Sequence, residues 1–163
     1  MSYNLLKGKK GIIFGALNEE SIAWKVAERA HEEGAEFILS NAPVALRMGE
    51  LNKLAEDTGS LVVAADVTST EDLENLFKIA EEKFGKLDFI LHSIGMSINV
   101  RKKIHYTEAN YDYYHKAMDI SAMSFHRVMK IAKQKDIMNE WGSILALSFI
   151  AAQMAIPGYN DMS

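Results

Sequence analysis

Short apolar runs alternate with helical patterns along this chain, and that alternation most constrains its fold. Most positions within each run are apolar, so the strands are predicted to be buried on both faces, as a parallel sheet requires. The predicted strands are residues 11–14, 36–40, 61–65, 87–91 and 143–148. Strict alternation of strands and helices predicts a doubly wound, mostly parallel α/β sheet with helices on both faces.

The intervening segments repeat apolar residues at helical spacing. Four helices are predicted. The first begins near Ser21, and the second runs from residue 46 to Gly59. The third begins around Thr68 and Glu71 and ends at Gly85, and the fourth covers residues 110–137. Ser21 is expected to cap its helix, and the spacing of Thr68 and Glu71 predicts a capping box. Both prolines, Pro43 and Pro157, are placed in connections, and the tyrosines at 111, 113 and 114 are expected to pack at the start of the last helix.

Composition excludes several classes of function. The 163 residues carry a net charge of −4 with no basic cluster, which disfavours nucleic-acid binding. The absence of cysteine excludes disulfides, thiolate metal sites and cysteine nucleophiles, and no metal site is predicted. No apolar run approaches the ~18 residues that a membrane span needs, so we expect a soluble cytoplasmic protein.

Ligands of doubly wound sheets bind beyond the carboxyl ends of the strands, where the strand order switches. The first such segment begins at Gly15, which would let the backbone approach a phosphate, and Ser21 opens a helix whose N–H groups attract anions. The three-glycine dinucleotide fingerprint is absent, so an ordinary turn stays open as the alternative.

The later strand ends are compatible with the remaining parts of a dinucleotide. Residues 40–43 hold neither an acid for a ribose hydroxyl nor an arginine for a 2′-phosphate, which favours NADH. Asp66 either accepts a hydrogen bond from an adenine amino group or begins the next turn. The small residues Ser93 and Gly95 either leave room for a ribose or nicotinamide or form a plain turn.

Together these stretches resemble the short-chain dehydrogenase/reductase superfamily, and within it the bacterial NADH-dependent enoyl-acyl-carrier-protein reductases. The matching stretches are Leu6 to Lys10, Gly15 with Ser21-Ile-Ala-Trp24, Gly34-Ala-Glu36, Asp66-Val67, His92-Ser-Ile-Gly95, Asp119-Ile-Ser121 and Ala155 to Asn160. The resemblance runs from about Leu5 to the last residue. It implies one Rossmann-like dinucleotide-binding domain over residues 1–163.

The resemblance also implies a reaction, in which NADH reduces a 2-enoyl thioester on an acyl carrier protein during fatty-acid elongation. Tyr159 matches the family's catalytic tyrosine, and Ser97 matches a position that lines the acyl site. Ala42 stands where some members use Gln near the adenosine ribose. The other implied cofactor contacts are Gly15, Ala16, Ser21, Ile22, Asp66, Val67, Ser93, Ile94 and Gly95.

Two departures from the family pattern stand out. Phe149 occupies the position of a second family tyrosine in the substrate site, so the hydroxyl there is lost. The family lysine seven residues after the catalytic tyrosine would fall at position 166, so the domain is expected to be incomplete at its C-terminus. The family is usually tetrameric, and the implied interface draws on the helix over 110–137.

Two other interpretations remain open. One is a different short-chain oxidoreductase that acts on a carbonyl, although Ser163 stands where such enzymes place lysine. The other is a truncated nucleotide-binding or oligomerisation module without catalysis, which the missing lysine and Phe149 favour.

Overall fold

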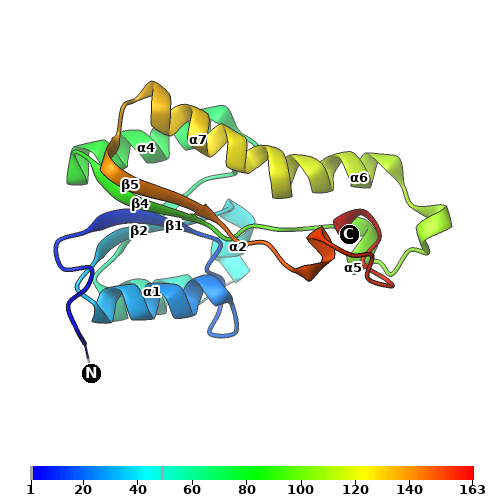
Figure 1. Cartoon of the computed structure of the whole chain (residues 1–163), viewed down its shortest axis with the longest axis horizontal. Coiled ribbons are helices and arrows are strands. Elements are labelled where there is room, and N and C mark those ends of the chain that lie inside the picture. Colours follow the sequence, from blue (N-terminus) through cyan, green and yellow to red (C-terminus); the bar gives the residue numbers. More distant parts are fainter. Residues whose placement is uncertain (1, 49) are drawn as a thin grey trace.

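The computed structural model describes residues 2–48 and 50–163 and contains one five-stranded, wholly parallel sheet (Figure 1). The strands lie in the order β3-β2-β1-β4-β5. Their bounds are β1 Lys10–Phe14, β2 Glu36–Asn41, β3 Leu61–Ala64, β4 Leu87–His92 and β5 Met138–Ala146. The order reverses between β1 and β4, which makes the carboxyl ends of these two strands the switch point of the sheet.

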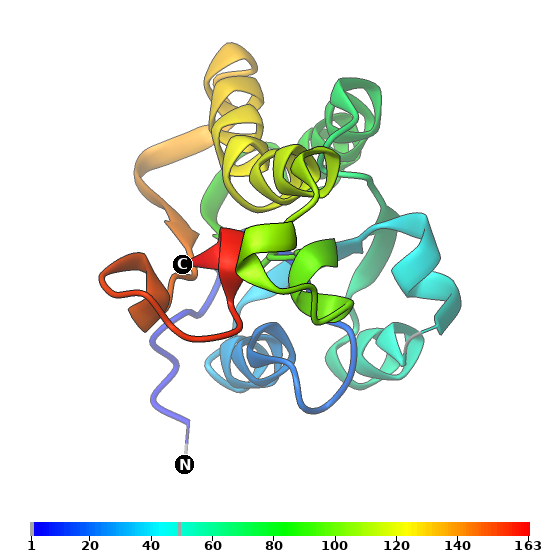
Figure 2. The same ribbon diagram turned by 90° about the vertical axis from the view of Figure 1, so that its right-hand side faces the viewer.

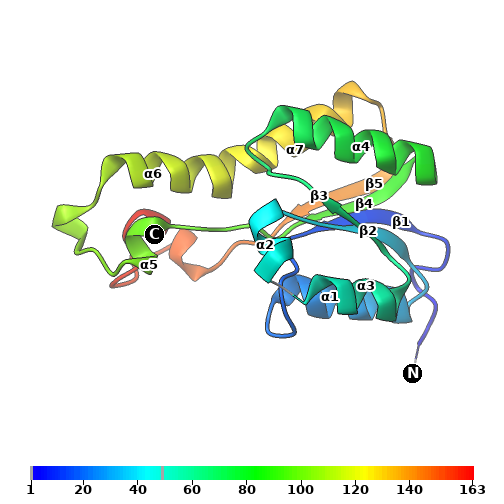
Figure 3. The ribbon, with the colours of Figure 1, turned by 180° about the vertical axis from the view of Figure 1, so that it is seen from behind.

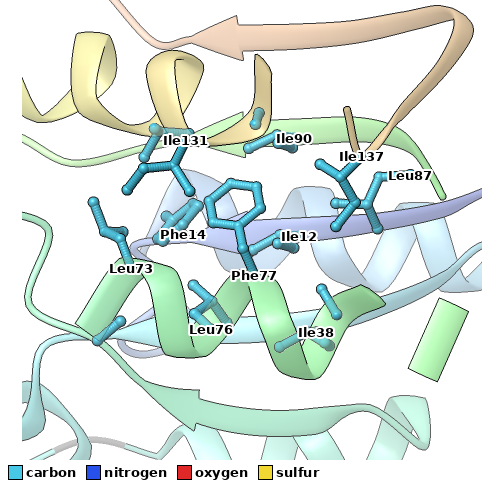
Figure 4. Packing of buried hydrophobic residues seen from close by; sticks show 14 of the residues in the cluster. Ile12, Phe14, Ile38, Leu73, Leu76, Phe77, Leu87, Ile90, Ile131 and Ile137 are labelled. Carbon is cyan, nitrogen blue, oxygen red and sulfur yellow. The ribbon is translucent and has the colours of Figure 1, made fainter. Parts of the chain in front are cut away.

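Helices cover both faces of the sheet, as the alternating pattern predicts. Helices α1 (Ile22–Glu32) and α3 (Leu51–Thr58) cover one face, and α4 (Thr70–Phe84) and α7 (Ser124–Gln134) cover the other (Figure 3). Alternate residues of β1 divide between the two cores, since Ile13 packs under α1 while Ile12 and Phe14 pack under α4 and α7 (Figure 4). The doubly wound α/β fold predicted from the sequence is confirmed.

Helix α1 shows how local sequence selects a buried face. Ala23, Trp24, Ala27 and Ala30 are buried at helical spacing, and small alanines let the helix lie close to the sheet. The helix ends before Gly34, whose φ of +88° is rarely adopted by residues that carry a side chain.

Several predicted boundaries are wrong, and local hydrogen bonds explain them. The capping residue of α4 is Ser69, whose hydroxyl accepts from the Asp72 amide, while Thr68 bonds to Asp66 instead. Pro43 lies in α2 (Pro43–Met48) as its first residue, where the missing N–H has no helical partner to lose. The helix predicted to run to Gly59 is two helices, α2 and α3, and position 49 between them lies outside the described residues.

The last predicted helix and strand also differ from the structure. The helix over 110–137 is α6 (Tyr111–Met118), a π-helical turn (Asp119–Met123) and α7 in continuous succession. Strand β5 begins five residues earlier than predicted, because Met138 already pairs with Leu87 of β4. Residues 139–142 form a register irregularity before the pairing resumes at Ser143. Tyr111 and Tyr114 are exposed, at 79% and 41%, so the expectation that they pack is wrong.

The carboxyl ends of all five strands face one side of the molecule, toward the viewer in Figure 2. On that side lie the short helix α5 (Ile98–Arg101) and the C-terminal residues, drawn in red. Helix α6 extends beyond the strand ends above them (Figure 1). Within the described residues, no helix is long and apolar enough to cross a membrane.

Strands β1 and β4 approach so closely at the switch point that only glycine fits at position 15. A Cβ built on Gly15 would lie 1.9 Å from the Ser93 carbonyl oxygen, and the residue has a φ of +92°. The Gly15 amide donates to the Ser40 carbonyl at 3.0 Å, and the Ser93 amide donates to the Phe14 carbonyl at 3.3 Å. The glycine expected to admit a phosphate is therefore also required by packing between strands.

We predict that Gly15→Ala lowers the free energy of unfolding by about 3 kcal/mol or more, because the clash falls on backbone that cannot move aside. Gly59→Ala is the matched control, since Gly59 also has positive φ but nothing within 4 Å of its built Cβ. The control should lose about 1 kcal/mol. Urea denaturation measures both values, and equal losses in the two variants would refute this account of Gly15.

Candidate functional site

The segment after β1 closes on itself through Ser21. The Ser21 hydroxyl donates to the Asn18 carbonyl at 2.6 Å and accepts from the Leu17 amide at 3.1 Å. Ser21 occupies the N-cap position of α1, but its side chain makes no bond to the first helical turn, so that expectation is wrong. The first amides of α1 keep no side-chain cap, which leaves them available for an anion.

A side chain that the sequence analysis missed joins the first two strand ends. The Asn41 Nδ2 donates to the Ala16 carbonyl at 2.9 Å, and the Asn41 Oδ1 accepts from the Ala42 amide at 2.8 Å. Ala16 is buried in the core under α1, and its carbonyl is bonded to Asn41. Asn41 therefore sets the relative position of the loops that carry Gly15 and Ala42.

The third strand end is an Asx turn. The Asp66 Oδ1 accepts from both the amide and the hydroxyl of Thr68, at 2.8 and 2.7 Å. Val67 is buried in the core under α4, whereas Asp66 is exposed. This geometry establishes the turn, and it leaves the Asp66 carboxylate facing solvent at the carboxyl edge of the sheet.

A cavity of about 410 Å³ opens beyond the carboxyl ends of β4 and β5. Four parts of the chain far apart in sequence line it: the start of α1, the end of β4, the helical stretch around the π turn, and the segment after β5. The lining residues are Ile22, Ser93, Ile94, Gly95, Ala117, Met118, Ser121, Ala122, Leu147, Ser148, Phe149, Asp161 and Met162. Four predicted cofactor residues and Phe149 are thus brought together at the switch point.

The π turn holds one wall of this cavity against the end of β4. The Ser121 hydroxyl accepts from the Met96 amide at 3.0 Å and lies 3.3 Å from the Met96 carbonyl. Arg127 pairs with Asp119 across the turn. π-Helical turns occur frequently at functional sites because they redirect the backbone locally.

Tyr159 lies beside Phe149, which lines the cavity, but Tyr159 is not itself a lining residue. Their ring centroids are 5.5 Å apart with a tilt of 46°, and each residue is 42% exposed. Within the described part of the chain, the Tyr159 hydroxyl has no hydrogen-bond partner, so it is free to bind a ligand. The structure therefore brings the predicted catalytic tyrosine next to Phe149.

Ser97, which matches a family position that lines the acyl site, is buried. It is 4% exposed, caps α5 by accepting from the Val100 amide, and donates its hydroxyl to Asp161. The sequence gives no sign of this role for Asp161, because an aspartate after a tyrosine motif carries no signal of its own.

His92, the first residue of the His92-Ser-Ile-Gly95 stretch, is buried and supports the end of β4 through a contact that the sequence did not predict. The His92 Nε2 lies 2.8 Å from the Ser124 hydroxyl, and that hydroxyl donates its single proton to the Ile120 carbonyl at 2.6 Å. The hydroxyl must then accept from His92, which assigns the proton to Nε2. Burial lowers the pKa of the imidazole, so His92 is neutral between Phe14 and Phe125.

No group of three or more metal-ligating side chains converges anywhere in residues 2–48 and 50–163. The edge instead presents backbone amides, small residues and one free phenol. A parallel sheet in the order β3-β2-β1-β4-β5 with a pocket at its switch point defines a doubly wound fold of the Rossmann type.

The particular family follows from comparison with known proteins. A family model described as Enoyl-(Acyl carrier protein) reductase matches residues 15–163, and the chain belongs to this family. Enoyl-[acyl-carrier-protein] reductase [NADH] 1 of Rhizobium meliloti is 36% identical over 159 residues, and the corresponding protein FabI of Aquifex aeolicus is 36% identical over 163. These matches cover 97% of this chain in both cases.

Solved structures of the family superpose closely on this chain. A crystal structure of a FabI–NADH complex from Alistipes finegoldii has a TM-score of 0.96 and 63% identity over 98% of this chain. An NAD complex of the enzyme from Anaplasma phagocytophilum has a TM-score of 0.89 and 33% identity over 99%. The chain spans only part of the length of these proteins. It covers 57% of the R. meliloti relative and 58% of the A. aeolicus relative. It covers 57% of the A. finegoldii chain and 61% of the A. phagocytophilum chain.

The buried imidazole predicts how stability depends on pH. The folded-state pKa of His92 lies below the unfolded value near 6.5, so the unfolded chain binds the extra proton first as pH falls. The free energy of unfolding should therefore decrease below about pH 6.5, by up to about 1.4 kcal/mol per pH unit. His92→Gln, which keeps a donor near Nε2 but does not titrate, should show a shallower decrease in urea unfolding between pH 7.5 and 5.5. Parallel curves for the two proteins would contradict the assignment.

Proposed function

We propose that this chain forms the cofactor-binding part of an NADH-dependent reductase of 2-enoyl thioesters. The observation that carries the proposal is the ring contact of Tyr159 with Phe149, which lines a cavity together with Ser93, Ile94 and Gly95 at the switch point. Family membership and similarity to NADH-dependent relatives support the same reaction.

The strand ends fit a dinucleotide cofactor. The uncapped first turn of α1, beyond Ser21 and Ile22, suits a pyrophosphate, because its amides lack side-chain partners. In this proposal the exposed Asp66 and the Val67 backbone bind the adenine amino group, and Ala42 contacts the adenosine ribose. The cavity of about 410 Å³ at Ser93 to Gly95 is large enough for a nicotinamide and its ribose.

Tyr159 supplies the chemistry that this chain adds to the bound cofactor. NADH held along this edge provides the hydride for the β-carbon of the enoyl thioester. Negative charge then develops on the thioester carbonyl oxygen, and the Tyr159 hydroxyl donates a hydrogen bond to that oxygen. A proton added at the α-carbon completes the reduction. The free phenol beside Phe149 is suited to this role.

Phe149 keeps an aromatic wall where many family members have a second tyrosine. Its ring packs against Tyr159, which restricts the phenol without contributing a hydroxyl. In this proposal Phe149 shapes the substrate site, and Tyr159 is the sole phenolic donor of the pair.

The proposal includes the setting in which the enzyme acts. Relatives named for acyl-carrier-protein substrates support an enoyl group carried by such a protein. We further propose a cytoplasmic homo-oligomer, a tetramer as the family resemblance implies. Exposed apolar residues on the α6–α7 stretch, namely Met118, Met123 and Met129, suit a subunit contact there.

An assay of NADH oxidation with a crotonyl thioester tests the proposed function. Tyr159→Phe should lower turnover by about 10² or more, the scale for loss of one oxyanion donor. Tyr111→Phe is the control, because that exposed ring lies outside the cavity, and its turnover should equal that of the wild type.

The substrates separate the competing interpretations. Oxidation of NADH with a ketone but not with the enoyl thioester would indicate a carbonyl reductase. Binding of NADH with no turnover of either substrate would indicate a binding module. An unchanged rate in Tyr159→Phe would remove Tyr159 from the mechanism.

A further inference from the structure

The turn that carries Tyr159 is fastened to the segment around α5 by its neighbours. The Asn160 Nδ2 donates to the Ile104 carbonyl at 2.5 Å, and Met162 lies against Ser121, whose hydroxyl is 4.0 Å from the Met162 sulfur. Between these two contacts, Asp161 turns its side chain inward and is 9% exposed. Figure 2 shows this C-terminal turn, in red, in contact with α5.

Both carboxylate oxygens of Asp161 accept hydrogen bonds from buried side chains. Oδ1 accepts from the Ser97 hydroxyl, and Oδ2 accepts from the Asn99 Nδ2 at 2.9 Å. Asn99 is fully buried, and Ser97 is nearly so. A carboxylate matches this pair of donors because both of its oxygens are acceptors.

The orientation of the Asn99 amide follows from a second neighbour. Its Oδ1 accepts from the Asn110 amide at 3.0 Å, so its nitrogen must face Asp161 and the Asn110 carbonyl. Asn110 in turn caps α6 by accepting from the Tyr113 amide. The network therefore runs from the start of α6 through Asn99 to the residue two positions after Tyr159.

A buried carboxylate is an expensive way to fill space, because desolvation opposes it unless every oxygen is bonded. A packing role alone would be served by an apolar side chain of similar size. The two directed donors instead define one position for the Asp161 backbone. Asp161 is the middle residue of the 3₁₀ turn Asn160–Met162, which follows Tyr159 directly and transmits that position to it.

We propose that Asp161 is a positioning residue that holds Tyr159 beside Phe149, with Ser97 and Asn99 as its partners. In this role the Ser97 hydroxyl serves the turn rather than the acyl chain. The inference rests on the proposed function for its effect on rate, but the placement of the Tyr159 ring is measurable without any reaction.

Nuclear Overhauser contacts between the Phe149 and Tyr159 rings report that placement, since their centroids lie 5.5 Å apart. Asp161→Ala should weaken these contacts and lower kcat about 10-fold or more, because small misplacements of a reacting group are costly. The Kd for NADH should change by a smaller factor than kcat, since Asp161 lines the cavity with only 9% of its surface exposed and its carboxylate is bonded to Ser97 and Asn99. Asp57→Ala, an exposed acid on α3, should leave all three readouts unchanged.

A pair of exchange variants separates positioning from loss of folding. Asn99→Asp sets two carboxylates against each other and should also weaken the ring contacts. The double variant Asn99→Asp with Asp161→Asn restores one donor facing one acceptor between the two side chains, but it leaves the Asn110 carbonyl facing an oxygen. Compared with Asn99→Asp alone, it should recover the contacts and the kcat in part. Failure of the double variant to recover either readout would overturn the proposal, as would unchanged ring contacts in Asp161→Ala.

The two proposals fail in distinguishable ways. A wild type that shows the ring contacts but reduces no enoyl thioester would defeat the proposed function, and the contacts in the variants would still test Asp161. Normal turnover with unaltered contacts in Asp161→Ala would defeat the positioning role alone.

Discussion

The close approach of β1 to β4 at Gly15 and Ser93 is the constraint on which the rest of the site depends. The sheet order reverses there, so the chain leaves β1 toward one face and β4 toward the other. Because position 15 has no side chain, the backbones of the two strand ends are in direct contact where the strand order reverses. The divergence of the two connections beyond it opens the cavity at Ser93 to Gly95.

The remaining walls are attached to that junction by polar contacts between distant segments. Ser121 in the π turn binds the Met96 backbone, and Asp161 binds Ser97. His92 supports the same strand end from inside the core through Ser124. The cavity is therefore a joint product of β4, the α6–α7 stretch and the segment after β5, and each of them is held by at least one directed hydrogen bond.

The fold could be predicted from the sequence because its signal is local. Buried parallel strands are apolar at most positions, and the helices between them repeat apolar residues at helical spacing, so all five strands were located. Caps were less predictable, since Thr68 with Glu71 and Ser69 with Asp72 have the same spacing and only the structure distinguishes them.

The site was predictable only where its residues form motifs. Gly15, Ser93 to Gly95 and Tyr159 lie in stretches that resemble a known family, whereas Asp161 and Asn99 are 62 positions apart and meet only in the folded chain. The His92–Ser124 pair, 32 positions apart, carried no local signal either. Ser21 illustrates the opposite error, because its capping position was predicted while its hydroxyl bonds within the preceding loop.

A titration of the ¹⁵N-labelled protein with NADH, followed by two-dimensional amide NMR, tests the central claim most directly. Binding at the switch point predicts that amides of residues 15–22, 66–67 and 93–95 shift together, with one affinity. Amides at the opposite edge of the sheet, such as Lys7 to Lys9, should stay in place. Shifts at that opposite edge, or none at the switch point at saturating NADH, would contradict the account.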